Sequence, residues 1–320
     1  MYRYVVRRLL LFIPTMLGAA TLIFLIMRIV PGDVATLILG GYGGEGGIIK
    51  QGDLNFFRDQ IGLNRPLLTQ FFDFIGGAVR GDLGTSVWTQ QPVLSEIRHR
   101  MPLDIQIVIM SAVIAFGLGI PFGILSALRQ DEWLDYVVRT ISIMGLAVPV
   151  FWLGIVIVLM LVTFFNWSAP LENPGFFKDP STNMQQLAWP IVVVAFRQSA
   201  VILRMTRATM LEVLREDFIR TARAKGLAAR VVTWRHALRN AMLPVVTIGA
   251  MELAVLLGGL VLTEKVFNVP GMGAYLADSI LKRDFPVVQG IILVLVAVIL
   301  VVNLITDISY SWLDPRVRYN

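Results

Sequence analysis

The sequence predicts an all-α polytopic membrane protein with six transmembrane helices. Only 16% of its 320 residues are charged and 56% are apolar, whereas about 25% of the residues in a soluble protein are charged. Charged side chains are costly in hydrocarbon, so a shortage of them is typical of a chain that faces lipid. Six apolar runs approach or exceed the roughly 20 residues that a helix needs to cross a bilayer core. Each run is therefore expected to form one membrane-spanning helix.

The first run, residues 9–27, follows three arginines near the N-terminus. This arrangement is similar to a secretory signal peptide, but the run is too long and no small-residue cleavage site closes it. We therefore expect a retained first helix within residues 1–30, which ends where Pro31 and Gly32 interrupt the pattern.

Residues 31–100 form one long polar region and are predicted to be a small folded insertion. Its Gly-rich stretch "GGYGGEGG" is typical of a flexible link. A first helix is expected after an N-cap at Asp53, with a stop at Gly62. The stretch "PLLTQFFDFIGGAVRGDLG" predicts a second, amphipathic helix. Phe, Leu and Ile are frequent enough here to bury a core, which argues against disorder.

The other five spans are expected within residues 101–320, which form the helical core. Their bounds are 103–128, 136–165, 187–205, 243–262 and 287–312. Pro149 lies inside the third span and is predicted to kink it, because a proline frees a backbone carbonyl. Residues 166–183 are predicted to form a loop.

The distribution of basic residues predicts the orientation in the membrane. Between the fourth and fifth spans lie Arg204, Arg207, Arg215, Arg220, Arg223, Lys225, Arg230, Arg235 and Arg239. Cytoplasmic loops are enriched in Lys and Arg, and an even number of spans puts both termini on one side. We therefore expect both termini and the loop of residues 207–242 in the cytoplasm, and the 31–100 insertion outside.

Several functional classes are disfavoured by composition. The net charge of +6 is explained by the cytoplasmic loops, and aromatic residues do not alternate with basic ones as in single-strand binders, so no nucleic-acid partner is expected. There are no cysteines and only two histidines, and no metal site is predicted. The pattern G-x-x-x-x-G-K-[ST] is absent, so any ATP that drives the protein must bind another chain.

The loop of residues 207–242 is predicted to be a helix, a glycine turn and a second helix. Residues 207–225 are mostly good helix formers, with Leu211, Leu214, Phe218 and Ala222 spaced as one apolar stripe. Gly226 lies where a left-handed C-cap would fall. The second helical pattern continues into the fifth span. From the residues alone, a loop that only retains positive charge inside the cell is an open alternative.

The stretch "RTARAKGLAARVVTWRHALRNAMLP" resembles the cytoplasmic EAA loop of ABC-importer permeases, in the form found in the peptide and nickel subfamily. Seven other segments resemble, in order, the B-type permease subunit of dipeptide and oligopeptide importers. They are "MYRYVVRRLL…RIVPGD", "IGLNRPLLTQF", "GDLGTSV", "GIPFGILSALRQDEWLD", "VPVFWLG", "EKVFNVPGMG" and "RDFPVVQG". The resemblance therefore extends over the whole chain.

The resemblance implies a permease subunit of an ATP-driven importer of di- or oligopeptides in the bacterial inner membrane. Such subunits pair with a C-type permease as a heterodimer and sit in membrane lipid on two ATPase subunits, which bind ATP and Mg. An extracytoplasmic binding protein delivers the substrate. By this resemblance the chain forms half of the translocation path, binds no cofactor and has no catalytic residue.

The resemblance also implies that the loop is a coupling helix that docks in a cleft of the ATPase. The positions carried over are Glu212, Arg215, Asp217, Arg220, Thr221, Ala222, Arg223, Ala224, Lys225 and Gly226. The glutamate of the broader motif is Arg220 here, and the gap from Gly226 to "MLP" is longer, which puts the usual salt bridge in question. Ala222 and Ala224 are expected to allow close approach, and the basic residues to pair with acidic groups of the ATPase.

Two charged residues lie near the middle of predicted spans: Arg197 in the fourth and Glu252 in the fifth. Ionisable groups at that depth pair with each other or line a water-filled path. Both a structural ion pair and a lining of the peptide route are open. A nickel or glutathione importer is the alternative within the family, and a proton-driven carrier that uses Glu252 and Asp307 is the alternative outside it. A membrane-embedded enzyme is disfavoured, since no nucleophile–base pair is evident.

Overall fold

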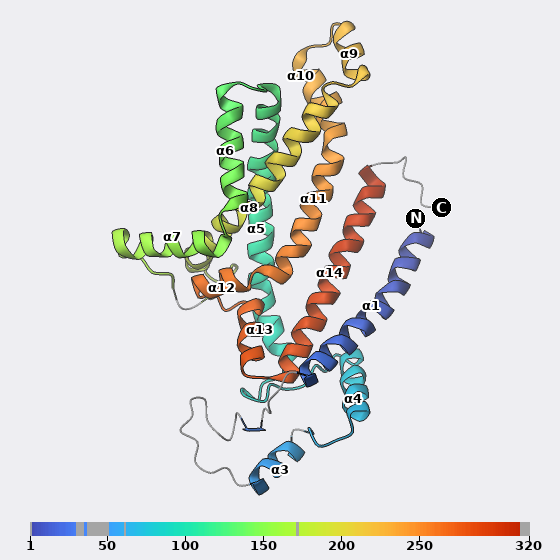
Figure 1. Cartoon of the computed structure of the whole chain (residues 1–320), viewed down its shortest axis with the longest axis vertical. Coiled ribbons are helices and arrows are strands. Elements are labelled where there is room, and N and C mark those ends of the chain that lie inside the picture. Colours follow the sequence, from blue (N-terminus) through green and yellow to red (C-terminus); the bar gives the residue numbers. More distant parts are fainter. Residues whose placement is uncertain (1, 30–34, 37–50, 61, 171–172, 314–320) are drawn as a thin grey trace. The chain divides into compact units, whose positions relative to one another are not determined.

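The computed structural model describes residues 2–29, 35–36, 51–60, 62–170 and 173–313 (Figure 1). Within these ranges the regular elements are helices, and Thr85 and Pro92 form an isolated antiparallel bridge. Five helices are long and apolar enough to cross a membrane, and a bent pair of helices makes six. The chain is thus an all-α polytopic membrane protein, as predicted. The "GGYGGEGG" stretch lies outside the described residues.

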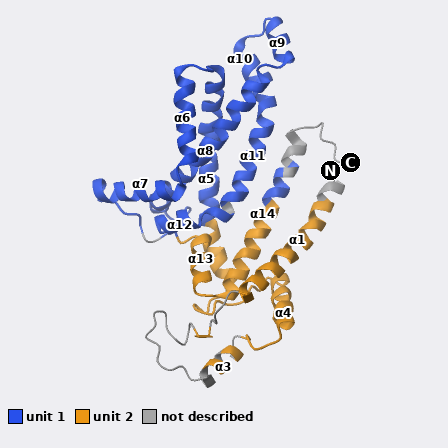
Figure 2. Ribbon diagram, in the orientation of Figure 1, with its two compact units in different colours: residues 1, 103–269, 302–320 blue, residues 2–102, 270–301 orange. Residues whose placement is uncertain are grey.

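The chain divides into two compact units (Figure 2). The first contains residues 1, 103–269 and 302–320, and the second contains residues 2–102 and 270–301. Helices α5 (Val93–Leu128) and α14 (Phe285–Leu313) contribute to both. Helix α5 begins before the expected end of the 31–100 insertion.

The first unit is built around α8 (Pro180–Val213), which packs against α6 (Trp133–Ala147), α7 (Val150–Phe165), α11 (Leu238–Gly259) and α12 (Val261–Phe267). Its core includes Ile107, Leu187, Ile191, Val194 and Phe267. Helices α5 and α8 approach so closely at Gly123 that a β-carbon there would lie 2.6 Å from Cβ of Thr206. Small residues at such contacts are typical of membrane helices, where close packing drives association.

Helix α8 extends well beyond the expected span of 187–205. Asp179 caps its first turn, accepting hydrogen bonds from the backbone N–H groups of Ser181 (3.1 Å) and Thr182 (3.2 Å). Pro180 follows at the first helical position, where its missing N–H costs nothing. At 34 residues, the helix is about 51 Å long. Its N-terminal end includes residues 180–183, so the predicted loop of residues 166–183 is too long, and its C-terminal end includes the first residues of the segment 207–225 that was predicted to be helical.

The third predicted span is two helices, α6 and α7, that meet at an angle of 98°. Pro149 stands immediately before α7, so the predicted kink is confirmed at the predicted residue. The bend is sharper than a proline kink inside one helix, because Val148 and Pro149 both have extended backbone. Helix α7 ends at Asn166, whose φ of 48° is left-handed.

The second unit contains α1 (Tyr2–Ile29), α3 (Gln51–Gln60), α4 (Leu67–Val79), α13 (Met272–Leu281) and the first part of α14. Its core includes Ala20, Val93, Met272, Val287 and Ile291. Helix α1 lies where the first helix was predicted, and the predicted amphipathic helix is α4.

Of the two predicted ends of α3, the C-terminal one is confirmed and the N-terminal one is wrong. Gly62 has a φ of +73°, and the Leu63 N–H returns to the Arg58 carbonyl at 2.9 Å, so the predicted stop is confirmed. The predicted cap at Asp53 is wrong, because α3 begins at Gln51 and Asp53 lies inside the helix.

Candidate functional site

The segment between α8 and α11 contains a break that the sequence did not predict. Helix α8 ends at Val213, a short turn follows, and α9 (Asp217–Ala224) begins. The turn is closed by hydrogen bonds from Arg215 N–H to the Glu212 carbonyl and from Glu216 N–H to the Val213 carbonyl, both 3.1 Å. The prediction of one helix over residues 207–225 is therefore wrong.

The break changes which residues of α9 face the protein core. Ile219 is fully buried and Ala222 is 6% exposed, whereas Phe218 is 43% exposed. These two residues join a core cluster with Ile124, Ala127, Met210, Val232, Ala237 and Ala241, which come from α5, α8 and the segment that leads into α11. Phe218 is thus not part of the expected apolar stripe. Ala222 cannot give a partner close access, because it packs inward, and only Ala224 is exposed.

Helix α9 ends in a Schellman motif centred on Gly226. The Gly226 N–H donates to the Arg223 carbonyl (2.9 Å) and the Leu227 N–H to the Ala222 carbonyl (3.3 Å). Gly226 has a φ of +76°, which a residue with a β-carbon adopts only with strain. The predicted left-handed cap is confirmed.

The second helical pattern after Gly226 is also confirmed. Helix α10 (Ala229–Val231) continues through a π-helical turn, Val232–Ala237, into α11. The π-helical turn was not predicted. Such turns are rare and frequently lie at functional sites.

Among the exposed charges of this segment, acidic residues predominate at the break and basic residues at the other end of α9. A groove of about 540 Å³ at the break is lined by Ala208, Leu211, Glu212, Arg215, Glu216 and Asp217. At the other end of α9, Arg220, Arg223 and Lys225 are exposed. The Arg220–Asp217 ion pair (3.3 Å) is 76% and 93% exposed and contributes little, about 0–1 kcal/mol. A partner surface would therefore need basic groups against the groove and acidic groups against the end of α9.

Thr221 is exposed on the same helix, and its hydroxyl donates to the Asp217 carbonyl one turn earlier at 2.9 Å. That bond is internal to α9. The hydroxyl oxygen still has lone pairs for a partner.

A buried ion pair fixes α8 to α6 just before the break. The Nε and Nη2 groups of Arg207 donate to the two carboxylate oxygens of Asp135, each at 2.7 Å. The Ser126 hydroxyl and the Asp131 N–H donate to the same carboxylate. The side chain of Asp135 is 0% exposed. The sequence did not predict this role of Asp135. In the sequence, Asp135 is recognisable only as an acidic residue in the first turn of a helix.

Arg197 and Glu252, predicted inside two spans, are brought together between α8 and α11. Nη1 of Arg197 lies 3.0 Å from Oε2 of Glu252. The side chains are 37% and 20% exposed, so the pair is neither fully buried nor fully solvated.

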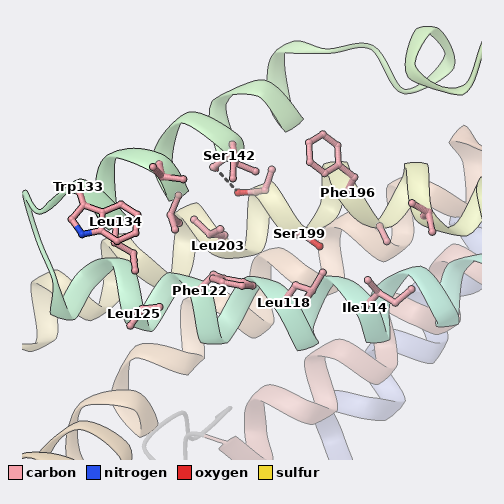
Figure 3. Close-up of a pocket in the computed structure, with 16 residues that line it drawn as sticks. Ile114, Leu118, Phe122, Leu125, Trp133, Leu134, Ser142, Phe196, Ser199 and Leu203 are labelled. Atoms are coloured by element: carbon pink, nitrogen blue, oxygen red, sulfur yellow. Dashed lines mark hydrogen bonds between the residues drawn. The ribbon is translucent and has the colours of Figure 1, made fainter. Parts of the chain in front are cut away.

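A cavity of about 550 Å³ lies between α5, α6 and α8 (Figure 3). Its walls are apolar, among them Leu118, Phe122, Trp133 and Leu203. The Ser142 hydroxyl is used in a hydrogen bond to the Ala200 carbonyl, 3.1 Å. A peptide needs polar groups to hold its backbone and termini, and this cavity has no charged side chain, so it does not suit a peptide. Over the described ranges, no group of three or more His, Cys, Asp or Glu residues is placed to hold a metal.

Comparison with known proteins gives full-length matches. The family described as "Binding-protein-dependent transport system inner membrane component" matches residues 119–319, and the corresponding N-terminal family matches residues 1–108. A dipeptide transport system permease protein of Alkalihalophilus pseudofirmus is 35% identical, and an oligopeptide transport system permease protein of Bacillus subtilis is 37% identical. A glutathione transport system permease protein of Escherichia coli is 38% identical. In all three cases the match covers 100% of both chains.

Proposed function

This chain belongs to the family of binding-protein-dependent transport system inner membrane components, and from that membership we propose that it is the permease subunit of an ABC importer of di- and oligopeptides. The observation that carries the proposal is identity of 35% and 37% over full length to permeases of dipeptide and oligopeptide systems. The glutathione permease, at 38% identity, supports a second candidate. Glutathione is itself a small peptide, so both candidates share one substrate class.

In the proposed assembly this chain works with four other chains. The chain pairs with a C-type permease and forms half of the path, two ATPase subunits hold ATP and Mg, and a binding protein delivers substrate from outside. The lack of a phosphate-cradling motif in the sequence supports ATP binding by another chain.

The proposed orientation places both termini and α9 in the cytoplasm and α4 outside. The cluster of basic residues between α8 and α11 supports it. Because the chain has no cysteine, single cysteines at the exposed positions Val79 and Ala228 test it. An impermeant thiol reagent applied to intact cells should label Val79→Cys only. Labelling of Ala228→Cys would show that the orientation is opposite to the proposed one and that α9 is not in the cytoplasm.

In this proposal α9 is the coupling helix, and the exposed residues from the end of α8 to the end of α9 dock on the ATPase. The docking face is formed by Glu212, Arg215, Asp217, Arg220, Thr221, Arg223, Ala224 and Lys225. Ile219 and Ala222 hold α9 against α5, α8 and the start of α11, so a displacement of α9 is passed to those helices. Gly226 sets the angle at which the chain leaves α9.

Arg197 and Glu252 are proposed to line the translocation path within the same unit. Their partial exposure at 37% and 20% supports this role. Charged groups at this depth in a span are costly unless they pair or contact water. These two side chains pair with each other, and their exposed parts would face the water of the path.

The substitution Gly226→Val tests the coupling role. Valine at a φ of +76° costs on the order of 1–3 kcal/mol locally and tilts α9 away from its docking angle. ATP hydrolysis by the reconstituted complex with loaded binding protein should lose its stimulation, and peptide uptake should fall with it.

The matched control is Ala228→Val, which adds the same side chain two residues on. Ala228 is exposed and has extended backbone (φ −57°, ψ 141°) that suits valine. The Ala228→Val variant should retain stimulated ATP hydrolysis and peptide uptake. Normal stimulation of ATP hydrolysis in Gly226→Val would reject the hypothesis that Gly226 forms a coupling turn. The segment would then serve only to keep positive charge in the cytoplasm.

A further inference from the structure

Arg28, in the last turn of α1, has a half-buried guanidinium without an acidic partner among the described residues. Its Nη2 donates to the Oε1 atom of Gln70. The guanidinium carbon lies 5.3 Å from the ring centre of Phe24 and 5.2 Å from that of Phe285. Its Nε atom is buried and has no hydrogen-bond partner among the described residues. A half-buried cation in this state is destabilising unless an anion compensates it.

The same guanidinium lines a cavity of about 210 Å³ in the second unit. Its walls include Phe24, Leu63, Val87, Phe285 and Pro286. Gln289 also lines it, and this residue is only 7% exposed. The cavity therefore combines the unsatisfied Nε–H group of Arg28 and the amide of Gln289 with aromatic and aliphatic walls.

The other charges at the cavity cancel. Arg65 and Asp73 form an ion pair at 3.2 Å, and their side chains are 64% and 60% exposed. The net charge of the cavity is therefore the single positive charge of Arg28. This combination selects a small group with one negative charge and oxygen acceptors.

The position of Arg28 along α1 favours one source of that anion. The apolar span of α1 is Val6–Ile29, and Arg28 lies about 33 Å along the helix from its start. Because the hydrocarbon core is about 30 Å thick, Arg28 lies at the level of the lipid headgroups. Leu25 and Ile29, which flank it on the helix surface, are 51% and 77% exposed. We propose that this cavity binds the phosphate group of a membrane phospholipid, with the acyl chains along the exposed face of α1.

The geometry of the donors suits a phosphate. Two N–H groups on one edge of a guanidinium can donate to two oxygens of the same phosphate, which gives orientation as well as charge. The Phe24 and Phe285 rings hold the guanidinium in place, and the Gln289 amide supplies a further donor. The bound phosphate would also fix α4 to α1 through Gln70 and Arg28.

The test is lipid retention by the intact complex in detergent, with added palmitoyl-oleoyl phosphatidylglycerol, measured by native mass spectrometry. The wild type should retain one more phospholipid than Arg28→Gln, whose occupancy should fall at least ten-fold. Arg28→Lys should be intermediate, because the charge stays and the paired donors are lost. The matched control is Arg80→Gln, which removes an exposed arginine from the same unit and should retain the lipid. Equal retention in wild type and Arg28→Gln overturns the proposal.

A second variant keeps the test decisive if Arg28→Gln does not fold. Gln289→Glu places a carboxylate in the cavity, compensates Arg28 internally and should exclude phosphate. Phosphatidylglycerol should raise the Tm of the wild-type complex and leave that of Gln289→Glu unchanged. Dioleoylglycerol and inorganic phosphate should raise neither. A full shift with inorganic phosphate, or displacement of the lipid by dialanine, would show a free-phosphate or carboxylate site and reject the lipid assignment.

Discussion

Arg197 and Arg207 lie on the same helix and each has one acidic partner, yet their ion pairs are built differently. Arg207 donates two parallel hydrogen bonds of 2.7 Å to Asp135, which accepts two further bonds and is 0% exposed. Arg197 makes one contact of 3.0 Å with Glu252, and both side chains are partly exposed. Arg207 and Asp135 bind each other through two donors and both carboxylate oxygens, whereas among the described residues Arg197 contacts an acid through Nη1 alone.

The difference indicates different roles for the two regions of α8. A largely desolvated pair joined by two hydrogen bonds holds α6 and α8 in one arrangement, close to the start of the coupling segment. A singly bonded, partly exposed pair can exchange partners at low cost, as a polar lining of a path must do. Two predictions test this contrast, and the larger effect is expected at Asp135.

Replacing Asp135 by Asn should destabilise the protein by about 3–5 kcal/mol, because Arg207 is left buried without a counter-charge. The measurement is Tm of the purified complex in detergent. Arg207→Lys should cost less, because the charge remains and only the paired geometry is lost. Glu132→Gln, which changes an exposed carboxylate three residues earlier, serves as the control and should leave Tm unchanged. An unaltered Tm in Asp135→Asn would show that this pair does not hold α6 to α8.

Removing Glu252 should have a smaller effect on stability, about 1 kcal/mol, because the pair is partly exposed. Peptide uptake should fall far more than Tm does. The double-mutant cycle of Arg197→Ala with Glu252→Ala measures the coupling energy, which should stay below that of Arg207 with Asp135. A coupling energy as large as that of the buried pair would show that both pairs have a structural role.

The features that the sequence predicted depend on local properties. Hydropathy over about 20 residues is enough to place spans, and a glycine or proline restricts its own backbone. This is why the turn at Gly226, the stop at Gly62 and the bend at Pro149 were foreseen.

The features that were missed depend on residues far apart in the chain. The break after Val213 contains no glycine or proline, and it is compensated by burial of Ile219 against residues of α5 and the segment before α11. Asp135 looks like an ordinary acid near a helix start until α8 places Arg207 beside it. The role of Arg28 depends on Phe24, Gln70 and Phe285, which surround its guanidinium and supply no acidic group.

The bend between α6 and α7 has a consequence for biosynthesis. During insertion the machinery senses a single apolar stretch long enough to span the bilayer, but the finished structure has two helices of about 22–24 Å each, both shorter than the core. Leu153 and Ile157 of α7 pack against a cluster that contains Leu260 and Phe267. Those partners are translated much later, so α7 reaches its final place only after most of the chain has been made.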